Sequence, residues 1–190
     1  MISSQEARFV AQYGTPEHRS KLIDHSVGRK ILAQNGTDED KHKILDIPTT
    51  PHDPDLLYHI AQSGNDSHRD RIMKLPDIKF DTDIANTIAV NGNNKHRDQL
   101  INHDSPNVRR SVAQYGTDDH RDKLIGDQNE KVRHAVAQFG NVHQTKTLIN
   151  DHDYGVSMTA HGRNMRLNGK SFYDKIHNES TLTKIRNLLS

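Results

Sequence analysis

Histidine followed by arginine recurs along the chain, and these side chains are the first whose chemistry suggests a function. The pairs are His18-Arg19, His68-Arg69, His96-Arg97 and His120-Arg121, and two further arginines of a repeated segment are Arg109 and Arg133. Guanidinium groups at regular spacing suit a nucleic-acid backbone, where each phosphate contact adds affinity that salt removes. The pattern therefore marks these ten residues as candidate partner-binding residues.

The alternative interpretation is that the fold itself needs these residues. His120 lies four residues before Leu124 on the same predicted helical face, which would leave it half-buried between neighbouring units. Arg109 can cover apolar surface with its stem while pairing with Asp104 or Asp127. Lys and Arg number 26 against 25 Asp and Glu, and aromatic residues make up 5 % of the chain. This balance favours the structural interpretation over nucleic-acid binding.

An internal repeat positions the histidines and arginines. Its most regular feature is a glycine that follows Ala-Gln-x, found at Gly14, Gly36, Gly64, Gly92, Gly116 and Gly140, with spacings of 22, 28, 28, 24 and 24 residues. Ala stands three residues before each glycine, Gln stands two before it in five of the six copies, and an apolar pair follows eight and nine residues later. Agreement at so many positions predicts a tandem array of one structural unit.

Each unit predicts two short helices. Val108 and Val112 lie four residues apart on one face of the first helix, and the glycine is expected to end that helix in the left-handed conformation. Thr15, Thr37 and Thr117 then stand where an N-cap of the second helix is needed. Neither helix is long enough to be stable alone, so stacked units must bury their Val, Ala, Leu and Ile together. The recurring Gln is expected to hydrogen-bond a backbone group of the adjacent unit.

Two proline-rich inserts lengthen the repeat, at Ile47–Asp55 and Leu75–Asp83. Insertions in helical arrays project from one edge as loops, so both are candidates for a specific contact. After Asn150 the pattern decays. We therefore divide the chain into a repeat array, residues 1–150, and a C-terminal region, residues 151–190.

The C-terminal region leaves alternatives open. The stretch that ends at Gly162 is either a worn seventh unit or irregular structure. Ser180–Ser190 predicts a final helix with one apolar face, which either caps the last repeat or mediates dimerisation or docking.

The sequence resembles the HEAT-like repeats, in particular the leucine-rich-variant type, as a pattern over residues 7–151 and tightly over residues 104–151. Units of that type read D-x-x-x-x-V-R-x-x-V-A, then a turn and a short helix ending in Leu. The matching residues are Asp104, Val108-Arg109, Val112-Ala113 and Leu124, then Asp127, Val132-Arg133, Val136-Ala137 and Leu148. The resemblance implies an all-α solenoid, a right-handed superhelix of six to seven two-helix units in which the second helix can be 3₁₀-like. It implies no single activity, because members are mostly binding scaffolds and a minority act on DNA.

The sequence gives little support for catalysis. It contains no Cys, which excludes disulfides, thiolate metal sites and cysteine nucleophiles, and it lacks the HExxH, GxSxG, P-loop and Rossmann patterns. No apolar run reaches the about 18 residues of a membrane span, and the N-terminus does not read as a signal peptide, so a cytoplasmic protein is expected. We predict no enzyme, cofactor or metal. The predicted function is a protein-binding scaffold, adaptor or inhibitor that docks on a larger protein complex through the solenoid face or the insert loops, and the alternative is nucleic-acid binding through the His-Arg positions.

Overall fold

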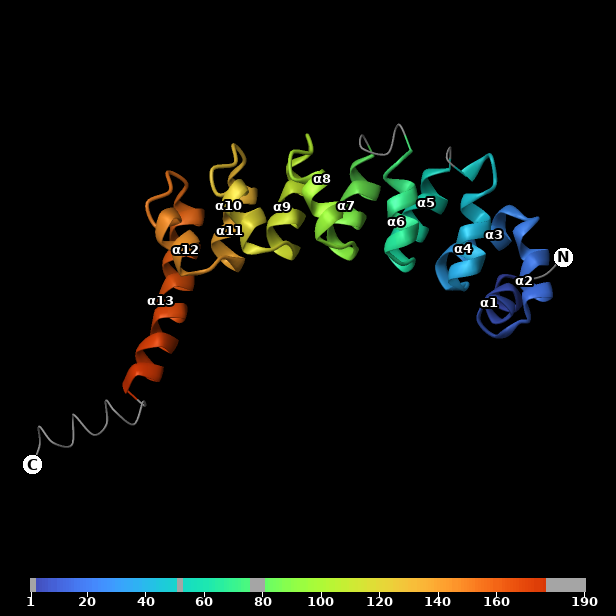
Figure 1. Ribbon diagram of the computed structural model, residues 1–190, viewed down its shortest axis with the longest axis horizontal. Helices are drawn as coiled ribbons and strands as arrows, with labels where there is room; N and C mark the ends of the chain where they lie inside the picture. Colours follow the sequence, from blue (N-terminus) through green and yellow to red (C-terminus); the bar gives the residue numbers. More distant parts are fainter. Residues whose placement is uncertain (1–2, 51–52, 76–80, 177–190) are drawn as a thin grey trace, which may run out of the picture. The chain divides into compact units, whose positions relative to one another are not determined.

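The structure is a computed structural model that describes residues 3–50, 53–75 and 81–176, with side chains of the last helix described as far as Gly169. Every regular element within these ranges is a helix (Figure 1). Helices of ten residues are α1 (Ser4–Tyr13), α3 (Ser26–Asn35), α5 (Pro54–Ser63), α7 (Thr82–Asn91), α9 (Pro106–Tyr115) and α11 (Glu130–Phe139). Shorter helices alternate with them: α2 (Pro16–Ile23), α4 (Asp38–Leu45), α6 (Asp66–Ile72), α8 (Asn94–Leu100), α10 (Asp118–Leu124) and α12 (Val142–Leu148). The last helix, α13 (Tyr154–Ile176), has 23 residues.

The all-α solenoid of two-helix repeats predicted from the sequence is confirmed. Each odd-numbered helix from α1 to α11 ends one residue before its repeated glycine, and an even-numbered helix begins just beyond it. The even-numbered helices are α-helical, so the 3₁₀ geometry that the resemblance allowed is absent from them. Among the residues described, no helix combines the length and the apolar character needed to cross a membrane.

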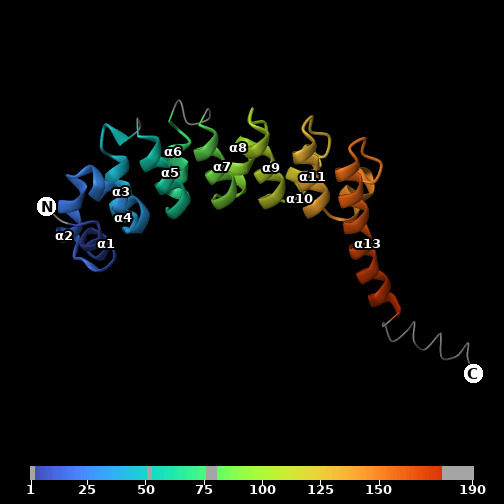
Figure 2. The same ribbon diagram turned by 180° about the vertical axis from the view of Figure 1, so that it is seen from behind.

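The chain forms two compact units, Met1–Val112 and Ala113–Ser190, and the division falls inside α9. Within the first unit α1, α3, α5 and α7 pack in succession, and each is also packed by the even-numbered helix that follows it (Figure 2). The side chains of Leu32, Ile60 and Ile88 are fully buried between these helices. Stacking of neighbouring repeats therefore builds the core, as expected for units too small to fold alone.

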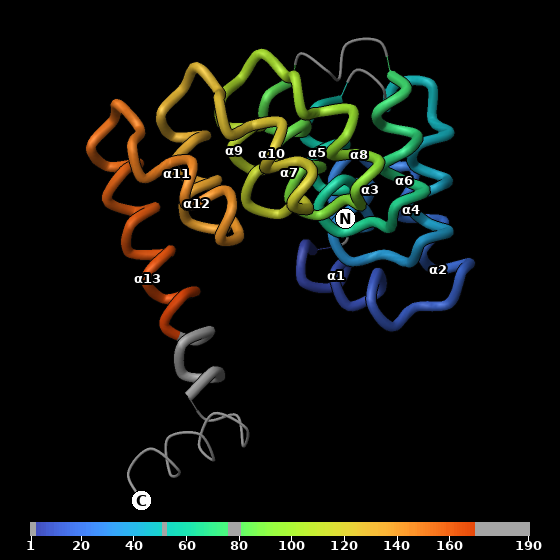
Figure 3. The backbone as a smooth tube through the Cα atoms, turned by 60° about the vertical axis from the view of Figure 1, so that its left-hand side comes forward, coloured from blue at the N-terminus to red at the C-terminus, as the bar shows by residue number. Residues whose placement is uncertain are grey.

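In the second unit, α13 packs on both α11 and α12 and then continues past them (Figure 3). Val156 of α13 is buried like Val132 of α11, 24 residues earlier, so α13 begins as the first helix of a seventh repeat. Asn164 stands where Gly140 ends α11, and α13 runs on through Gly162. The expected end of a unit at Gly162 is thus wrong, because the residue in the terminating position is not glycine. The predicted helix Ser180–Ser190 lies outside the described residues, and the division at residue 150 stays a prediction.

The repeated glycines act by a different mechanism from the one expected. None of the glycines described has a positive φ; Gly14, for example, is extended, with φ −72° and ψ 160°. A Cβ on Gly92 would lie 2.6 Å from the Ile88 carbonyl oxygen and 2.7 Å from Nδ1 of His96. The prediction of a left-handed conformation is therefore wrong. Glycine is needed here because the next helix begins against the end of the previous one.

Candidate functional site

Three of the four repeated histidines are buried at the third residue of even-numbered helices. His68 and His96 are 0 % exposed, and His120 is 3 % exposed. In α6 the Asn65 N–H donates to His68 Nδ1 at 3.0 Å, while the His68 N–H donates to Asn65 Oδ1 at 3.3 Å. The same reciprocal bonds form in α8. They satisfy two backbone donors that a helix start leaves free, which is the role of a capping box.

The other nitrogen of two of these rings binds the preceding repeat. His68 Nε2 donates to the Asp38 carbonyl oxygen at 3.1 Å, and His96 Nε2 donates to Asp70 Oδ1 at 2.9 Å. Because a backbone N–H occupies Nδ1, the ring must be the Nε2–H tautomer. Each of these histidines therefore ties the start of its own helix to the helix of the repeat before it.

Repeats without histidine at this position have another hydrogen-bond acceptor there. Asp40 Oδ2 accepts from the Thr37 N–H at 2.9 Å, and Gln144 Oε1 accepts from the Asn141 N–H at 2.9 Å. In the first repeat His18 is exposed, and its N–H donates to the predicted N-cap Thr15 at 3.4 Å. In the second and sixth repeats the residue type differs while the hydrogen bond from the N-cap N–H is retained, which indicates a structural requirement.

The arginines that follow the histidines turn toward the ends of odd-numbered helices. Arg69 Nε donates to the Ala61 carbonyl at 2.9 Å, and Arg97 Nε donates to the Ala89 carbonyl at 2.9 Å. Arg121 reaches the Ala113 and Gly116 carbonyls, and Arg19 reaches the Gly14 carbonyl. A cation at a helix C-terminus satisfies carbonyls that have no partner within the helix. These guanidinium groups thus serve the helix ends of their own repeats.

Burial shifts the titration of this network. Desolvation lowers the pKa of the His68 imidazole, and the nearby His42 adds to that effect, while the bond to the Asp38 carbonyl opposes it. Desolvation also lowers the pKa of the Arg97 guanidinium, although Asp66 opposes the shift. The neutral form of His68 is therefore the form that the folded repeat favours.

Arg109 and Arg133 belong to a second series, which holds the loops between repeats. Arg109 donates to the His103 carbonyl at 2.8 Å and to the Asp104 carbonyl at 2.9 Å. Arg133 donates to the Asp127 carbonyl at 2.8 Å and forms a two-point ion pair with Asp151, at 2.7 and 3.0 Å. The hydrogen bond with Asp151 raises the pKa of Arg133 and, from the other side, lowers the pKa of Asp151.

Sequence reasoning missed one member of this loop-holding series. Arg29 stands seven residues before Gly36 and donates to the Ile23 carbonyl at 3.0 Å. The repeats that follow the proline-rich inserts have Leu57 and Ala85 at that position. In the first insert the buried Thr50 hydroxyl instead donates to the carbonyl of Ile44 at 2.7 Å. The signal that could have found Arg29 is its distance from the repeated glycine.

Gln34 does not form the backbone hydrogen bond expected of the recurring Gln, and for the other copies that expectation stays a prediction. Gln34 binds the ring of His59 in the next repeat, with 3.0 Å between Nε2 atoms, rather than a backbone group. Gln12, Gln62 and Gln138 are exposed. Their positions leave them on the outer surface of the odd-numbered helices.

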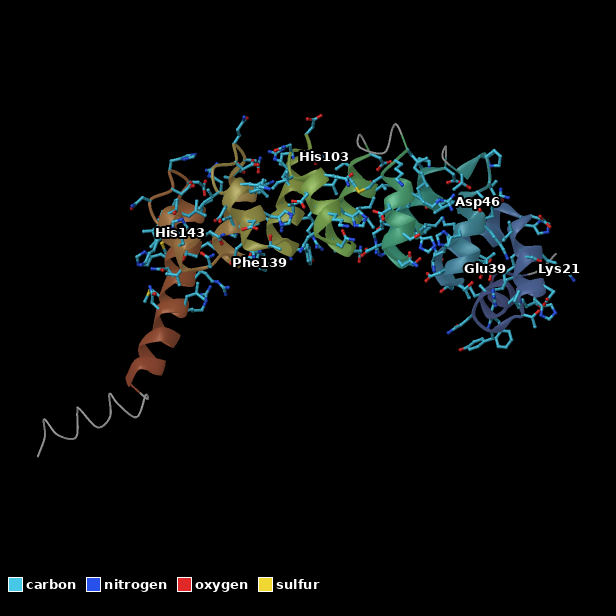
Figure 4. All side chains as sticks on the ribbon, in the orientation of Figure 1. Lys21, Glu39, Asp46, His103, Phe139 and His143 are labelled. Carbon is cyan, nitrogen blue, oxygen red and sulfur yellow. The ribbon has the colours of Figure 1, made fainter. Side chains whose placement is uncertain are left out.

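Large apolar side chains are exposed only on odd-numbered helices, within the part of the chain that the structure describes. They are Phe9, Tyr13, Val27, Tyr115, Tyr154, Met158 and Met165. Phe9 and Tyr13 contact each other on α1, with ring centroids 5.1 Å apart. Even-numbered helices present charged residues instead, such as Lys21 and Glu39 (Figure 4). Sequence reasoning did not single out Tyr13 and Tyr115. The signal that could have found them is an aromatic residue directly before the repeated glycine.

A half-open cavity of about 490 Å³ lies at the N-terminal end of the first unit, between α1 and the α2–α3 connection. Ala7, Leu22 and Val27 supply its apolar lining, and Asp24 and His25 lie at its polar side. Its volume is in the range of small-molecule sites, but its walls are open. In the described residues, no group of three His, Cys, Asp or Glu side chains is placed to hold a metal ion.

The fold and these contacts define a helical-repeat protein, in which short paired helices stack in tandem. A leucine-rich repeat variant with a novel repetitive structural motif is similar in structure, with a TM-score of 0.52, 17 % sequence identity and coverage of 86 % of this chain and 87 % of that chain. A designed armadillo repeat protein is also matched, with a TM-score of 0.35, 15 % identity and coverage of 86 % and 99 %. No family model and no curated protein matches the sequence. The likeness to the leucine-rich repeat variant shows the helical-repeat fold.

Proposed function

We propose that the protein is a binding scaffold that holds another protein against the outer faces of its odd-numbered helices. The observation that carries this proposal is the confinement of exposed aromatic and apolar residues to those helices. Aromatic side chains and Met are enriched at protein interfaces, and exposed apolar clusters on a folded protein mark interaction sites. In the first unit the contacting pair Phe9 and Tyr13 is the proposed anchor.

The proposal makes the His-Arg positions part of the scaffold rather than part of the interface. Arg69 and Arg97 are 6 and 8 % exposed, and their guanidinium groups bind carbonyl oxygens of their own repeats. A phosphate contact would require these groups to leave those carbonyls. The geometry therefore favours protein binding over the nucleic-acid alternative.

Site-specific photo-crosslinking tests the proposal. Tyr13 is replaced by a photoreactive phenylalanine analogue in the organism that encodes the protein, and Ser67, exposed on α6, is the matched position on an even-numbered helix. We expect one defined protein adduct from position 13, none from position 67, and loss of the adduct when Phe9→Asp is added. Equal adducts from both positions, or none from position 13, would contradict the proposal.

A titration with labelled DNA and RNA tests the alternative directly. Phosphate contacts would give binding at about 50 mM salt that weakens steeply toward about 200 mM. We expect no binding at the lower concentration. Tight, salt-dependent binding that is weakened by Arg97→Ala would replace the scaffold proposal.

A further inference from the structure

Phe9 of α1 lies on a side of the helix that a neighbouring helix covers in later repeats of the first unit. It stands five residues before its repeated glycine and is 65 % exposed. At the same position, Ile31 of α3 is 5 % exposed and Thr87 of α7 is 7 % exposed. Helix α1 packs on α3, and α5 packs on α7, whereas the structure describes no helix before α1. Phe9 therefore differs from these two residues in lacking a neighbouring helix.

Hydrogen bonds between repeats confirm that this position contacts the preceding odd-numbered helix. In the first unit the Ser111 hydroxyl of α9 donates to Asn86 Oδ1 of α7 at 2.6 Å. In the second unit Thr159 Oγ1 of α13 lies 2.9 Å from His134 Nε2 of α11. Ser111 stands five residues before its repeated glycine, and Thr159 stands five residues before Asn164, which takes the place of that glycine. The contact therefore recurs in both units.

Two further positions of an odd-numbered helix contact the helix before it. Nine residues before the glycine, Asp55 of α5 forms an ion pair with Lys30 of α3 at 2.5 Å. One residue before the glycine, the Ser63 hydroxyl of α5 donates to the Ala33 carbonyl of α3 at 2.6 Å. The first contact joins the N-terminal halves of the two helices and the second joins their C-terminal ends, so the two helices run parallel.

The residues of α1 at these three positions are Gln5, Phe9 and Tyr13, and all three are exposed. Their spacing of four residues places them on one side of the helix. Phe9 and Tyr13 contact each other, with ring centroids 5.1 Å apart. A terminal repeat that faces only water needs a polar outer side for solubility. Aromatic residues at the positions that bind a preceding helix therefore indicate that another helix covers α1.

We propose that the partner protein docks an α-helix parallel to α1, in the position that α1 itself takes relative to α3. The inference rests on the proposed protein-binding function and specifies which segment of the partner binds at Phe9 and Tyr13. The docked helix continues the series of contacts between odd-numbered helices. Where Ser111 meets the amide of Asn86, Phe9 meets an apolar residue of the partner, because an amide opposite a phenyl ring would lose its hydrogen bond.

Photo-crosslinking at three positions of α1 tests the docked helix. The photoreactive phenylalanine analogue replaces Gln5, Phe9 or Tyr13, one at a time, in the full chain in the organism that encodes it. Mass spectrometry then identifies the crosslinked residue of the partner. We expect three sites within one segment of one protein, spaced by three or four residues and in the same order along the chain as in α1. The matched position is the exposed Gln12, whose counterpart Gln34 contacts the following repeat, and it should give no adduct at those sites.

The pattern of adducts separates this inference from the proposed function. Neighbouring crosslinker positions are about 6 Å apart along α1, a distance that an extended strand covers in about two residues. Sites spaced by two residues, sites in separate segments, or sites in the reverse order would overturn the docked helix while leaving a protein partner in place. Adducts within a second copy of this chain would also overturn it. Absence of any adduct from position 13 would contradict the proposed function and this inference together.

Discussion

The α7–α8 repeat and helix α13 use the same residue types in opposite ways. In the repeat, Gly92 gives room to His96, and Arg97 caps the helix end, so polar groups and backbone meet at close contact. In α13, Gly169 faces open space and Met165 is exposed. In this chain the recurring residues are therefore the ones that the scaffold needs, whereas exposed residues without a packing role are the ones that our proposal assigns to binding.

The largest effect is expected from Arg133→Ala, which removes one partner of a buried ion pair. Arg133 and Asp151 are both about 5 % exposed at their side chains, and Asp151 would be left buried without its cation. We expect a loss of roughly 3–5 kcal/mol in the free energy of unfolding. Lys131→Ala, an exposed change on the same helix, should leave that free energy nearly unaltered. Chemical denaturation measures both, and equal effects would show that the recurring arginines are not structural.

A smaller loss is expected from Gly92→Ala. The new Cβ would meet the backbone oxygen of Ile88 and the ring of His96, and the resulting overpacking should cost about 1–3 kcal/mol. Thermal melting checks the change. An unaltered melting temperature would mean that the close approach of the two helices is not what selects glycine.

The His68 capping box predicts a loss of stability at acid pH. The ring faces His42, Asp38 and Lys41, and burial holds the pKa of folded His68 below that of the unfolded chain, about 6.5. The unfolded state therefore binds the proton first, so the contribution of His68 is complete above that pH and is lost as the pH falls toward the folded pKa. Denaturation midpoints measured between neutral pH and pH 5 check this. His68→Gln should reduce the decline, because Gln144 fills the same position in another repeat; an unchanged profile would contradict the assignment.

The smallest effect, with the opposite sign, is expected from Gly169→Ala. No atom lies within 4 Å of the added Cβ, and replacing glycine by alanine inside a helix stabilises it by up to about 1 kcal/mol. Helical content from circular dichroism should rise slightly at elevated temperature. A destabilised variant would show that this glycine, like Gly92, is held in close contact within the chain.

The repeat and its two-helix unit could be predicted from sequence because both depend on local pattern. Val108 and Val112 reported the buried face, and the repeated glycine marked each helix end. The conformation of that glycine could not be predicted, because the reason for it is the neighbouring helix start, which is known only in three dimensions. Helix α13 runs through Gly162, because Gly162 lies two residues before the position of the repeated glycine, where Asn164 stands.

The sequence contains a signal for the capping role of the histidines, but the residue type is unusual for that role. Asn65 and His68, like Asn93 and His96, have the spacing of a capping box, with imidazole in place of the usual Glu or Gln. The partner of each Nε2 could not be predicted, since Asp38 and Asp70 belong to preceding repeats. The exposed pair Phe9 and Tyr13 was also missed, because aromatic residues beside a helix end can equally well be buried.

The most direct test of the central claim is the protonation pattern of the histidine rings, observed by nitrogen-15 NMR at pH 8. If the repeated histidines belong to the scaffold, His68 and His96 will show a single Nε2–H tautomer whose proton exchanges slowly, because Nδ1 accepts a backbone N–H and Nε2 binds the preceding repeat. The exposed His18 will show fast exchange. Fast exchange and averaged tautomers at His68 and His96 would contradict a structural role for these histidines. They would then again be candidates for partner binding.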